Sequence, residues 1–435
     1  MTAQIRFFWA RLNANYWFYP AVFALIAGAL AFGTVWLDRA GAAEYLNDVD
    51  WLVPVEPQGA SDILSVMASS MIAVASTVFS ITLVAVTYAS GTYGPRLLTN
   101  FLEDRGNQLS LATFIATFVY ALIVLRSVRA GDEGAAETLN AVQAFTPQLS
   151  LLIAYLLMGV SVGVLVFFLN HVPTSIRINK VLEQIGQRLI GTIRDTYPVE
   201  DEFRDARESE GGETLAARQT GYVQLIDFAE LESVARECGA VVSLRVRTGD
   251  FVHRSLPLLD VKGAAPGDLQ ERLRECFTLG PTRTPEQDPQ FLIDELVEIG
   301  LRALSPGIND PFTAITALHW LGAAISEIAR RDLRKDVCDE DSDDCPVIPC
   351  PDGFRHYAER SFGSIRSAVA ASPNAARVMI DTLEKAALPL SHRPRIEVLR
   401  DHARMLVEQA RLALVGPDLK MVEDRYRDFD AATSA

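Results

Sequence analysis

The sequence predicts a membrane domain of four transmembrane α-helices, followed by a cytoplasmic α+β domain with a small β-rich unit and a helical region. Apolar runs close to the roughly 20 residues that span a bilayer predict the membrane domain. The longest run, residues 63–95, has no ionisable acid or base between Asp62 and Arg96. Shorter strand-like and helix-like patterns after residue 172 predict the cytoplasmic domain.

Four apolar runs predict the transmembrane helices, and aromatic residues around the first one predict an uncleaved span rather than a signal peptide. The runs are residues 18–37, 63–88, 109–125 and 149–169. Basic residues cluster on one side of these runs, so the positive-inside rule predicts that both termini lie in the cytoplasm. These residues are Arg6, Arg11, Arg96, Arg105, Arg177, Lys180 and Arg188.

Hydroxyl side chains lie on one face of the second predicted span, at Ser69, Ser76, Ser80 and Thr87. One interpretation is close helix packing, because small residues let backbones approach each other in lipid. The other is a pore lining, in which copies of this face surround the axis of a homo-oligomer. The span contains no charged side chain, so a proton relay or an ion-coupled carrier would lack its usual carboxylate, whereas a channel would not need one.

The second span also carries a predicted hinge at Gly91, Gly94 and Pro95. Residues 63–95 would form a helix of roughly 45 Å, longer than the roughly 30 Å hydrocarbon core, so we expect a break on the cytoplasmic side. Residues 96–102 are expected to form a short interfacial helix after this hinge.

The chain divides by composition into five segments. Apolar positions in the connecting helix, at 172–199, suit either self-association or packing on the adjacent domain, and both interpretations stay open. The segments are a membrane domain at 1–171, a connecting helix at 172–199, an acidic linker at 200–218, a β-rich unit at 219–265, and a helical region at 266–435 with an acidic loop at 335–353.

Within the cytoplasmic half, strands are expected at residues 221–226, 240–247 and 251–261, with a short helix capped by Asp227. Helices are expected at residues 290–304, 311–333, 354–371, 373–388, 394–414 and 417–429.

The turn between the helices at 290–304 and 311–333 admits two interpretations. In the structural interpretation, the first helix ends here and the second begins with Asp310 as its N-cap, while Arg302 and Asn309 form hydrogen bonds at the junction. As a site, Arg302 and the amides of the next helix would hold an anionic ligand. The carboxylate of Asp310 counts against the site, because it would occupy the same amides.

Three segments resemble a bacterial family of predicted four-span membrane proteins catalogued as a domain of unknown function. They are residues 78–84, 94–98 and 302–314, and the run Ser-Pro-Gly-Ile-Asn-Asp-Pro in the last is the most specific. The resemblance covers roughly residues 5–415 and implies four spans in the bacterial inner membrane, but it implies no activity.

No catalytic or cofactor constellation is recognisable in the sequence. A phosphate-binding loop with its lysine, a serine elbow and a paired-histidine helix are all missing, so we do not expect an enzyme or a cofactor. A zinc site from Cys338, Cys345, Cys350 and His356 fits no common spacing, and the acidic loop lacks the pattern of a calcium loop, so no metal is expected.

Charge and cysteine content limit the partners. The 435 residues carry a formal net charge of −15, which argues against nucleic acid, because phosphate groups need clustered lysine and arginine. The five cysteines are odd in number and irregularly spaced, so we expect reduced thiols rather than a disulfide framework. They are Cys238, Cys276, Cys338, Cys345 and Cys350.

We therefore expect a homo-oligomer in the lipid bilayer whose cytoplasmic domain senses or gates, with a channel or transport role for an ion or small molecule that the sequence does not identify. The alternative is a membrane-anchored scaffold or signalling adaptor without a pore.

Overall fold

The computed structural model describes residues 12, 15–42, 55–94, 104–129, 145–199, 207, 211–263, 267–285, 287–334, 337–338 and 345–434. The described residues form two compact units, divided between Arg177 and Ile178.

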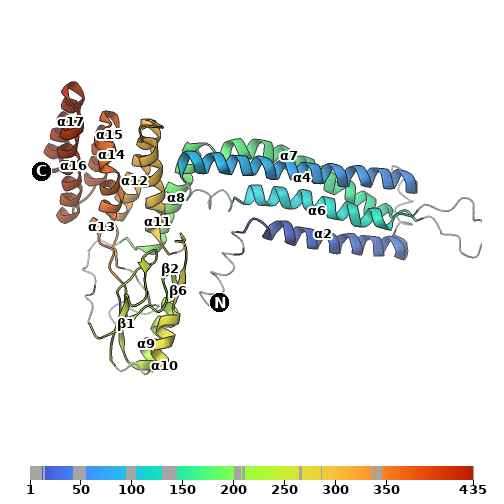
Figure 1. Ribbon diagram of the computed structural model, residues 1–435, viewed down its shortest axis with the longest axis horizontal. Coiled ribbons are helices and arrows are strands. Elements are labelled where there is room, and N and C mark those ends of the chain that lie inside the picture. The colour runs from blue at the N-terminus through green and yellow to red at the C-terminus, as the bar shows by residue number, and fades with distance from the viewer. Residues whose placement is uncertain are drawn as a thin grey trace, which may run out of the picture. The chain divides into compact units, whose positions relative to one another are not determined.

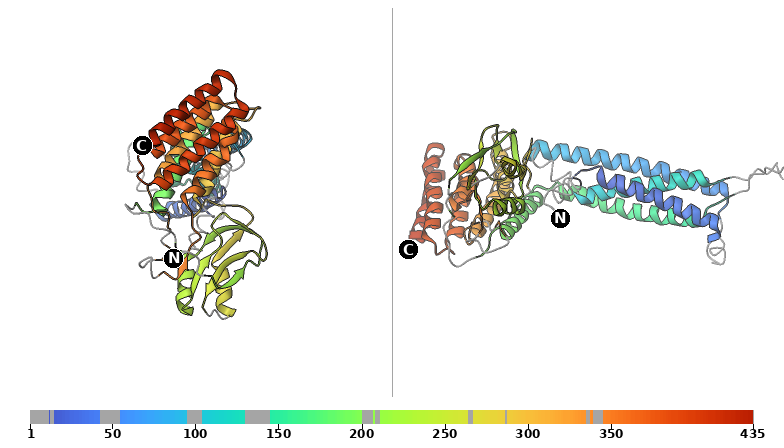
Figure 2. Two further views of the ribbon diagram at one scale, coloured as in Figure 1. Left: turned by 90° about the vertical axis from the view of Figure 1, so that its left-hand side faces the viewer. Right: turned by 90° about the horizontal axis from the view of Figure 1, so that it is seen from below.

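The first unit is a bundle of four long helices, which lie side by side in Figures 1 and 2. All four are long and apolar enough to cross a membrane. They are α2 (Phe18–Leu37, continued by the π-helical turn η1, Asp38–Ala42), α4 (Pro57–Tyr93), α6 (Arg105–Ser127) and α7 (Gln148–Ser175). The predicted fold class is confirmed, and α4 and α7 extend beyond the apolar runs that predicted them.

Large side chains fill the interior of this bundle. Phe114 and Tyr120 of α6 and Phe168 of α7 are almost completely buried, and alanines of α2 and α4 allow the helices to approach α6 closely. The Tyr120 hydroxyl lies 3.0 Å from the Thr34 hydroxyl and donates to the carbonyl of Ser150, so its polar end is satisfied inside the apolar core.

The predicted connecting helix at 172–199 is two helices. Pro173 lies inside the last turn of α7, and the chain breaks at Ile176 and Arg177 before α8 (Ile178–Thr196) begins. Proline at position 173 costs only one hydrogen bond so close to a helix end, so it does not start a new helix. The apolar face of α8 packs on α11 (Pro289–Ala303) and α12 (Pro311–Ile328) of the same unit, which is the second of the two packings considered.

The β-rich part of the second unit holds two small sheets. One has the strand order β1-β5-β3-β7 and the other β4-β2-β6. The predicted strand at 251–261 is broken at residues 253–256, where Ser255 has a positive φ, so β4 and β5 enter different sheets. The strands are β1 (Glu213–Ala216), β2 (Gly221–Ile226), β3 (Val241–Leu244), β4 (Phe251–Val252), β5 (Pro257–Lys262), β6 (Phe277–Gly280) and β7 (Val347–Ile348), with helices α9 (Phe228–Cys238) and α10 (Gly267–Glu275).

Three of these strands lie outside the segment expected to be β-rich. β1 belongs to the expected linker, β6 follows α10, and β7 pairs in parallel with β3 from a distant part of the chain. Strands this short are hard to predict from the local sequence, because only their packing into the common core of the β-rich part favours the extended conformation.

The remaining helices pack in layers that begin at α12, and Figure 1 shows these layers next to the sheets. They agree with the predicted ranges to within a few residues, except that α12 ends five residues early and α17 continues five residues further. They are α13 (Phe354–Ala358), the π-helical turn η2 (Glu359–Gly363), α14 (Ser364–Ala370), α15 (Pro373–Ala387), α16 (Arg393–Ala413) and α17 (Gly416–Ser434).

Candidate functional site

The hydroxyl face of α4, defined by Ser69, Ser76, Ser80 and Thr87, points away from the helices of its own chain. All four residues are exposed, whereas the opposite face, with Met67, Met71 and Val78, is buried in the bundle. The four residues thus lie on the outer face of the bundle, and their role as a pore lining or a packing face stays a prediction.

Each of these four hydroxyls donates to a carbonyl one turn earlier in the same helix. The distances from Oγ to the acceptor oxygen are 2.8 Å for Ser69, 2.9 Å for Ser76 and Ser80, and 2.8 Å for Thr87. Because the donors are satisfied within the helix, the face needs neither water nor a partner to avoid an unpaired group.

The predicted hinge lies only partly within the described residues. α4 continues through Gly91 to Tyr93, and Gly94 follows it with φ of 136°, a conformation that favours glycine. The helix therefore ends at Gly94 rather than bending at Gly91. Pro95 and the expected interfacial helix at 96–102 lie outside the described residues.

Two carboxylates that sequence reasoning missed hold the ends of the bundle helices. Asp38 accepts hydrogen bonds from the backbone N–H groups of Leu149 and Ser150, at 2.9 and 3.0 Å, and so caps the start of α7. Asp104 caps α6 and lies 2.8 Å from Nε2 of His171 on α7. The Asp38 cap and the Asp104–His171 contact have no local signal, because their partners are distant in sequence, whereas Asp104 caps α6 through the nearby N–H of Asn107.

The turn between α11 and α12 is a capped helix start. Oδ1 of Asp310 accepts from the backbone N–H of Thr313, and the N–H of Asp310 donates to the carbonyl of Ala303. The side chain of Arg302 lies 3.6 Å from Glu298, and Asn309 adopts a positive φ of 51°. Asp310 occupies an amide that an anion would use, and Arg302 pairs within its own helix, so an anion site at Arg302 and Asn309 stays a prediction.

A network of ion pairs joins the β-rich part of the second unit to its helices. Nη1 of Arg283 and Nη2 of Arg360 contact Asp294 of α11 at 2.5 and 2.6 Å, and Arg283 also contacts the buried Asp288 at 2.6 Å. Burial raises the pKa of Asp288 despite Arg283. Burial also acts to raise the pKa of Asp294, but its two guanidinium partners hold it below the ordinary value.

Asp352 is the centre of a second buried polar cluster. Its carboxylate lies 2.5 Å from Nε of Arg247 and accepts a bond of 3.4 Å from the hydroxyl of Tyr197, which lies 2.7 Å from the hydroxyl of Tyr357. Burial raises the pKa of both tyrosines, and burial followed by Arg247 lowers the pKa of the neighbouring His356. Opposite charges are paired here, as in a structural network.

A cavity of about 260 Å³ opens beside this cluster, lined in part by Asp332, Asp352 and Arg395. Arg395 donates to the carbonyls of Ile328, Ala329 and Arg331, and burial lowers its pKa to about 10, so it stays charged at neutral pH. The charged groups that line the cavity already pair with other groups of the protein. The cavity therefore offers no charged group set aside for a ligand.

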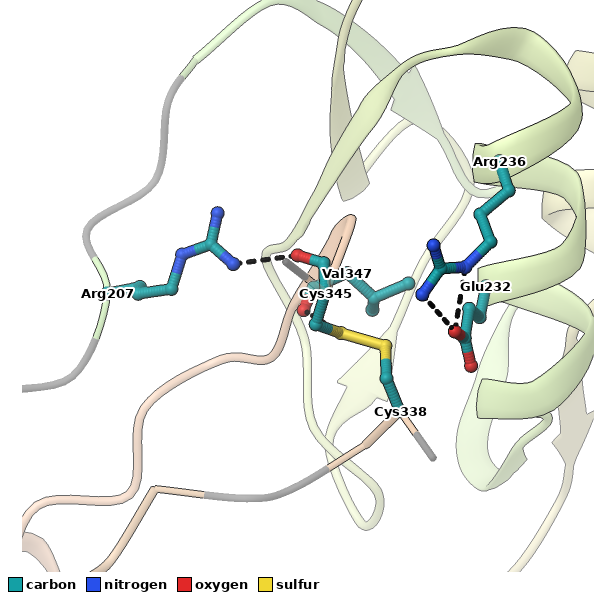
Figure 3. The surroundings of a disulfide bond; sticks show 6 residues. All are labelled: Arg207, Glu232, Arg236, Cys338, Cys345 and Val347. Carbon is teal, nitrogen blue, oxygen red and sulfur yellow. Dashed lines mark hydrogen bonds and ion pairs between the residues drawn. A yellow bond between two sulfur atoms is a disulfide. The ribbon is translucent and has the colours of Figure 1, made fainter. Parts of the chain in front are cut away.

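Cys338 and Cys345 form a disulfide, drawn in Figure 3, so the expectation of reduced thiols is wrong for these two residues. Pairing of β7 with β3 draws Cys345 into the core, and the carbonyl of Cys345 also accepts a 2.7 Å bond from Arg207. A disulfide supplies no thiolate to zinc. Among the described residues, no group of three or more His, Cys, Asp or Glu side chains is placed to hold a metal.

The comparisons identify relatives but no activity. The family model "Predicted membrane protein (DUF2254)" matches residues 13–385. Uncharacterized proteins of Mycobacterium tuberculosis and Mycobacterium bovis are 32% identical over 292 residues, which is 65% of this chain and 54% of theirs. The chain thus spans about half the length of the curated relatives it matches. No solved structure matches it significantly.

These matches cover the bundle and most of the second unit, and they confirm the resemblance carried by residues 78–84, 94–98 and 302–314. The chain belongs to the DUF2254 family of predicted membrane proteins.

Proposed function

We propose that the protein is a homo-oligomer of the bacterial inner membrane, in which copies meet along the hydroxyl face of α4 and enclose a passage for an ion or small solute. The observation that supports this proposal is the exposure of Ser69, Ser76, Ser80 and Thr87 on the outside of a bundle whose own interior is filled.

A passage within one copy is disfavoured by packing. The interior of the bundle is occupied by Phe114, Tyr120 and Phe168, each almost without solvent exposure. A conducting path would therefore lie between copies, and the exposed serines of α4 are the small side chains that permit close approach of helices in lipid.

In this proposal both termini lie in the cytoplasm, as the basic residues around the spans favour. The second unit then senses a cytoplasmic signal and acts on the passage through the link between α7 and α8. We assign it no catalytic step.

A second candidate is a membrane-anchored scaffold or signalling adaptor without a pore. The observation that favours it is that the four hydroxyls of α4 donate to their own helix, so that the face can pack dry against another copy or face lipid.

Disulfide cross-linking tests the proposed contact. With Ser76→Cys in the full chain in native membranes, a mild oxidant should give a cross-linked dimer, because Ser76 lies on the exposed face. Val78→Cys on the same helix is the matched control, since Val78 is 1% exposed and faces its own bundle. Equal cross-linking of both variants, or none above the wild-type chain with its five native cysteines, would contradict the contact.

Conduction separates the two candidates. In liposomes, single-channel recording under voltage, tension and osmotic stress should show openings, and the pair Ser76→Leu and Ser80→Leu should reduce the unitary conductance several-fold by replacing the lining. Cross-linking at Ser76 without any openings would instead support the scaffold.

A further inference from the structure

The turn between α11 and α12 presents apolar side chains to solvent. Phe312 is 75% exposed, Ile308 44% and Leu301 37%. We call these three residues the apolar tip. A phenylalanine left this exposed in the first turn of a helix is not explained by packing within the second unit.

The packing of α8 against α12 locates this tip along α8. Gly186 lies against the ring of Trp320, Arg194 pairs with Glu327 at 3.2 Å, and Arg331 donates to the carbonyl of Tyr197. The last two pairs are separated by 133 and 134 residues in sequence. Because this separation is nearly constant along the two helices, α8 and α12 run in the same direction. A separation of 134 residues also relates Phe312 to Ile178, the first residue of α8, so Phe312 lies level with Ile178.

Ile178 follows closely on the last membrane helix. α7 ends at Ser175, and the apolar part of this helix ends near Leu169. The helical steps from Leu169 to Ser175 rise roughly 9 Å, and the three steps across the break to Ile178 add at most roughly 10 Å. Ile178 therefore stays within roughly 20 Å of Leu169, close to the surface of the bilayer. Ile308 lies in the turn that precedes α12, so it extends beyond Phe312 at this end of the helix.

From these observations we propose that the apolar tip inserts into the interfacial layer of the lipid bilayer beside the point where the chain leaves the membrane. The three side chains expose on the order of 300 Å² together, far below the roughly 1,200 Å² of a stable protein interface. Such a small, protruding tip suits shallow insertion among lipid headgroups and acyl chains rather than a contact with a second copy.

Charge plays little part in this contact. Arg302 pairs with Glu298, and Asp310 is engaged in capping α12, so the surroundings of the tip carry no net positive charge from these three residues. We therefore expect the tip to insert into bilayers without anionic lipid, and Arg177, which directly precedes Ile178, can only add attraction to anionic ones. The inference does not depend on a passage or on an oligomer.

Photo-cross-linking in the full chain tests the proposal. Phe312→p-benzoylphenylalanine keeps an aromatic side chain at an exposed position, and irradiation in phosphatidylcholine vesicles should attach phospholipid to the peptide that contains residue 312. The matched control is the same probe at His319, which is exposed on α12 but seven residues further from the tip. The probe at Leu156, 67% exposed on α7, is the positive control for lipid contact.

We expect the lipid adduct at position 312 to be at least tenfold more abundant than at 319, and no less abundant in vesicles with anionic phosphatidylglycerol. Equal yields at 312 and 319, no adduct at 312 when 156 gives one, or cross-linking of 312 to a second copy of the chain would each overturn the proposal.

Discussion

His402 shows how burial sets the charge of a single side chain. It is 1% exposed on α16, its Nδ1 has no hydrogen-bond partner, and Nε2 lies 3.7 Å from Glu359. Burial lowers the pKa of His402 to about 4; Glu359 and Asp401 oppose this shift, and Arg366 and Arg355 add to it. The native protein therefore keeps this imidazole neutral at pH values where the unfolded chain has protonated it.

This difference predicts a pH-dependent stability of the second unit. Between pH 6.5 and about 4 the unfolded chain binds a proton at His402 that the native state does not, so stability falls as the pH falls through this range. At roughly 1.4 kcal/mol per pH unit, the loss amounts to about 3 kcal/mol. Urea unfolding of the detergent-solubilised chain at several pH values measures it.

His402→Gln should flatten this pH profile, because glutamine does not titrate, whereas His319→Gln, at an exposed position of α12, should leave it unchanged. An identical slope in the wild-type chain and in His402→Gln would show that other groups cause the acid sensitivity.

At the scale of elements, the packing of α8 on α12 depends on a glycine. A Cβ added at Gly186 would lie 2.2 Å from Cε3 of Trp320, so an alanine there must displace a large, inflexible ring. Gly191 lies on the same helix with nothing within 4 Å of the position of its Cβ. The helical spacing of apolar residues in α8 predicted a packed face, but nothing in the local sequence distinguished these two glycines.

Gly186→Ala should destabilise the second unit by about 1–3 kcal/mol through overpacking. Gly191→Ala should instead be neutral or stabilise it by up to about 1 kcal/mol, because alanine has the higher helix propensity. Urea midpoints of the two variants at neutral pH compare them directly. Equal effects at both positions would indicate that α8 and α12 do not pack through this contact.

At the scale of the whole molecule, the membrane topology and the disulfide lead to opposite expectations. The positive-inside rule predicts that the second unit lies in the reducing cytoplasm, whereas a disulfide such as Cys338–Cys345 is usual in oxidising compartments. The two thiols are held together by the fold in either case, so their oxidation state reports the compartment.

If the second unit is cytoplasmic, Cys338 and Cys345 should be reduced in intact cells. A membrane-permeant maleimide should then label the half-buried Cys338 and an impermeant one should not, as mass spectrometry would detect; Cys345, which is 5% exposed, should stay unlabelled by either reagent. Cys276 is the internal control, because burial raises the pKa of its thiol to about 12 and both reagents should leave it unmodified. Labelling of Cys350 by the impermeant reagent would place the unit outside.

The sequence by itself determined the four membrane helices, the hydroxyl face of α4 and the helices after residue 289, because each of these depends on composition and periodicity within one segment. The tertiary structure decided which way that face points, the cap that Asp38 provides to α7, the pairing of β7 with β3, and the joining of Cys338 to Cys345. These features depend on contacts between residues distant in the chain, and such contacts leave no periodic signal in either partner.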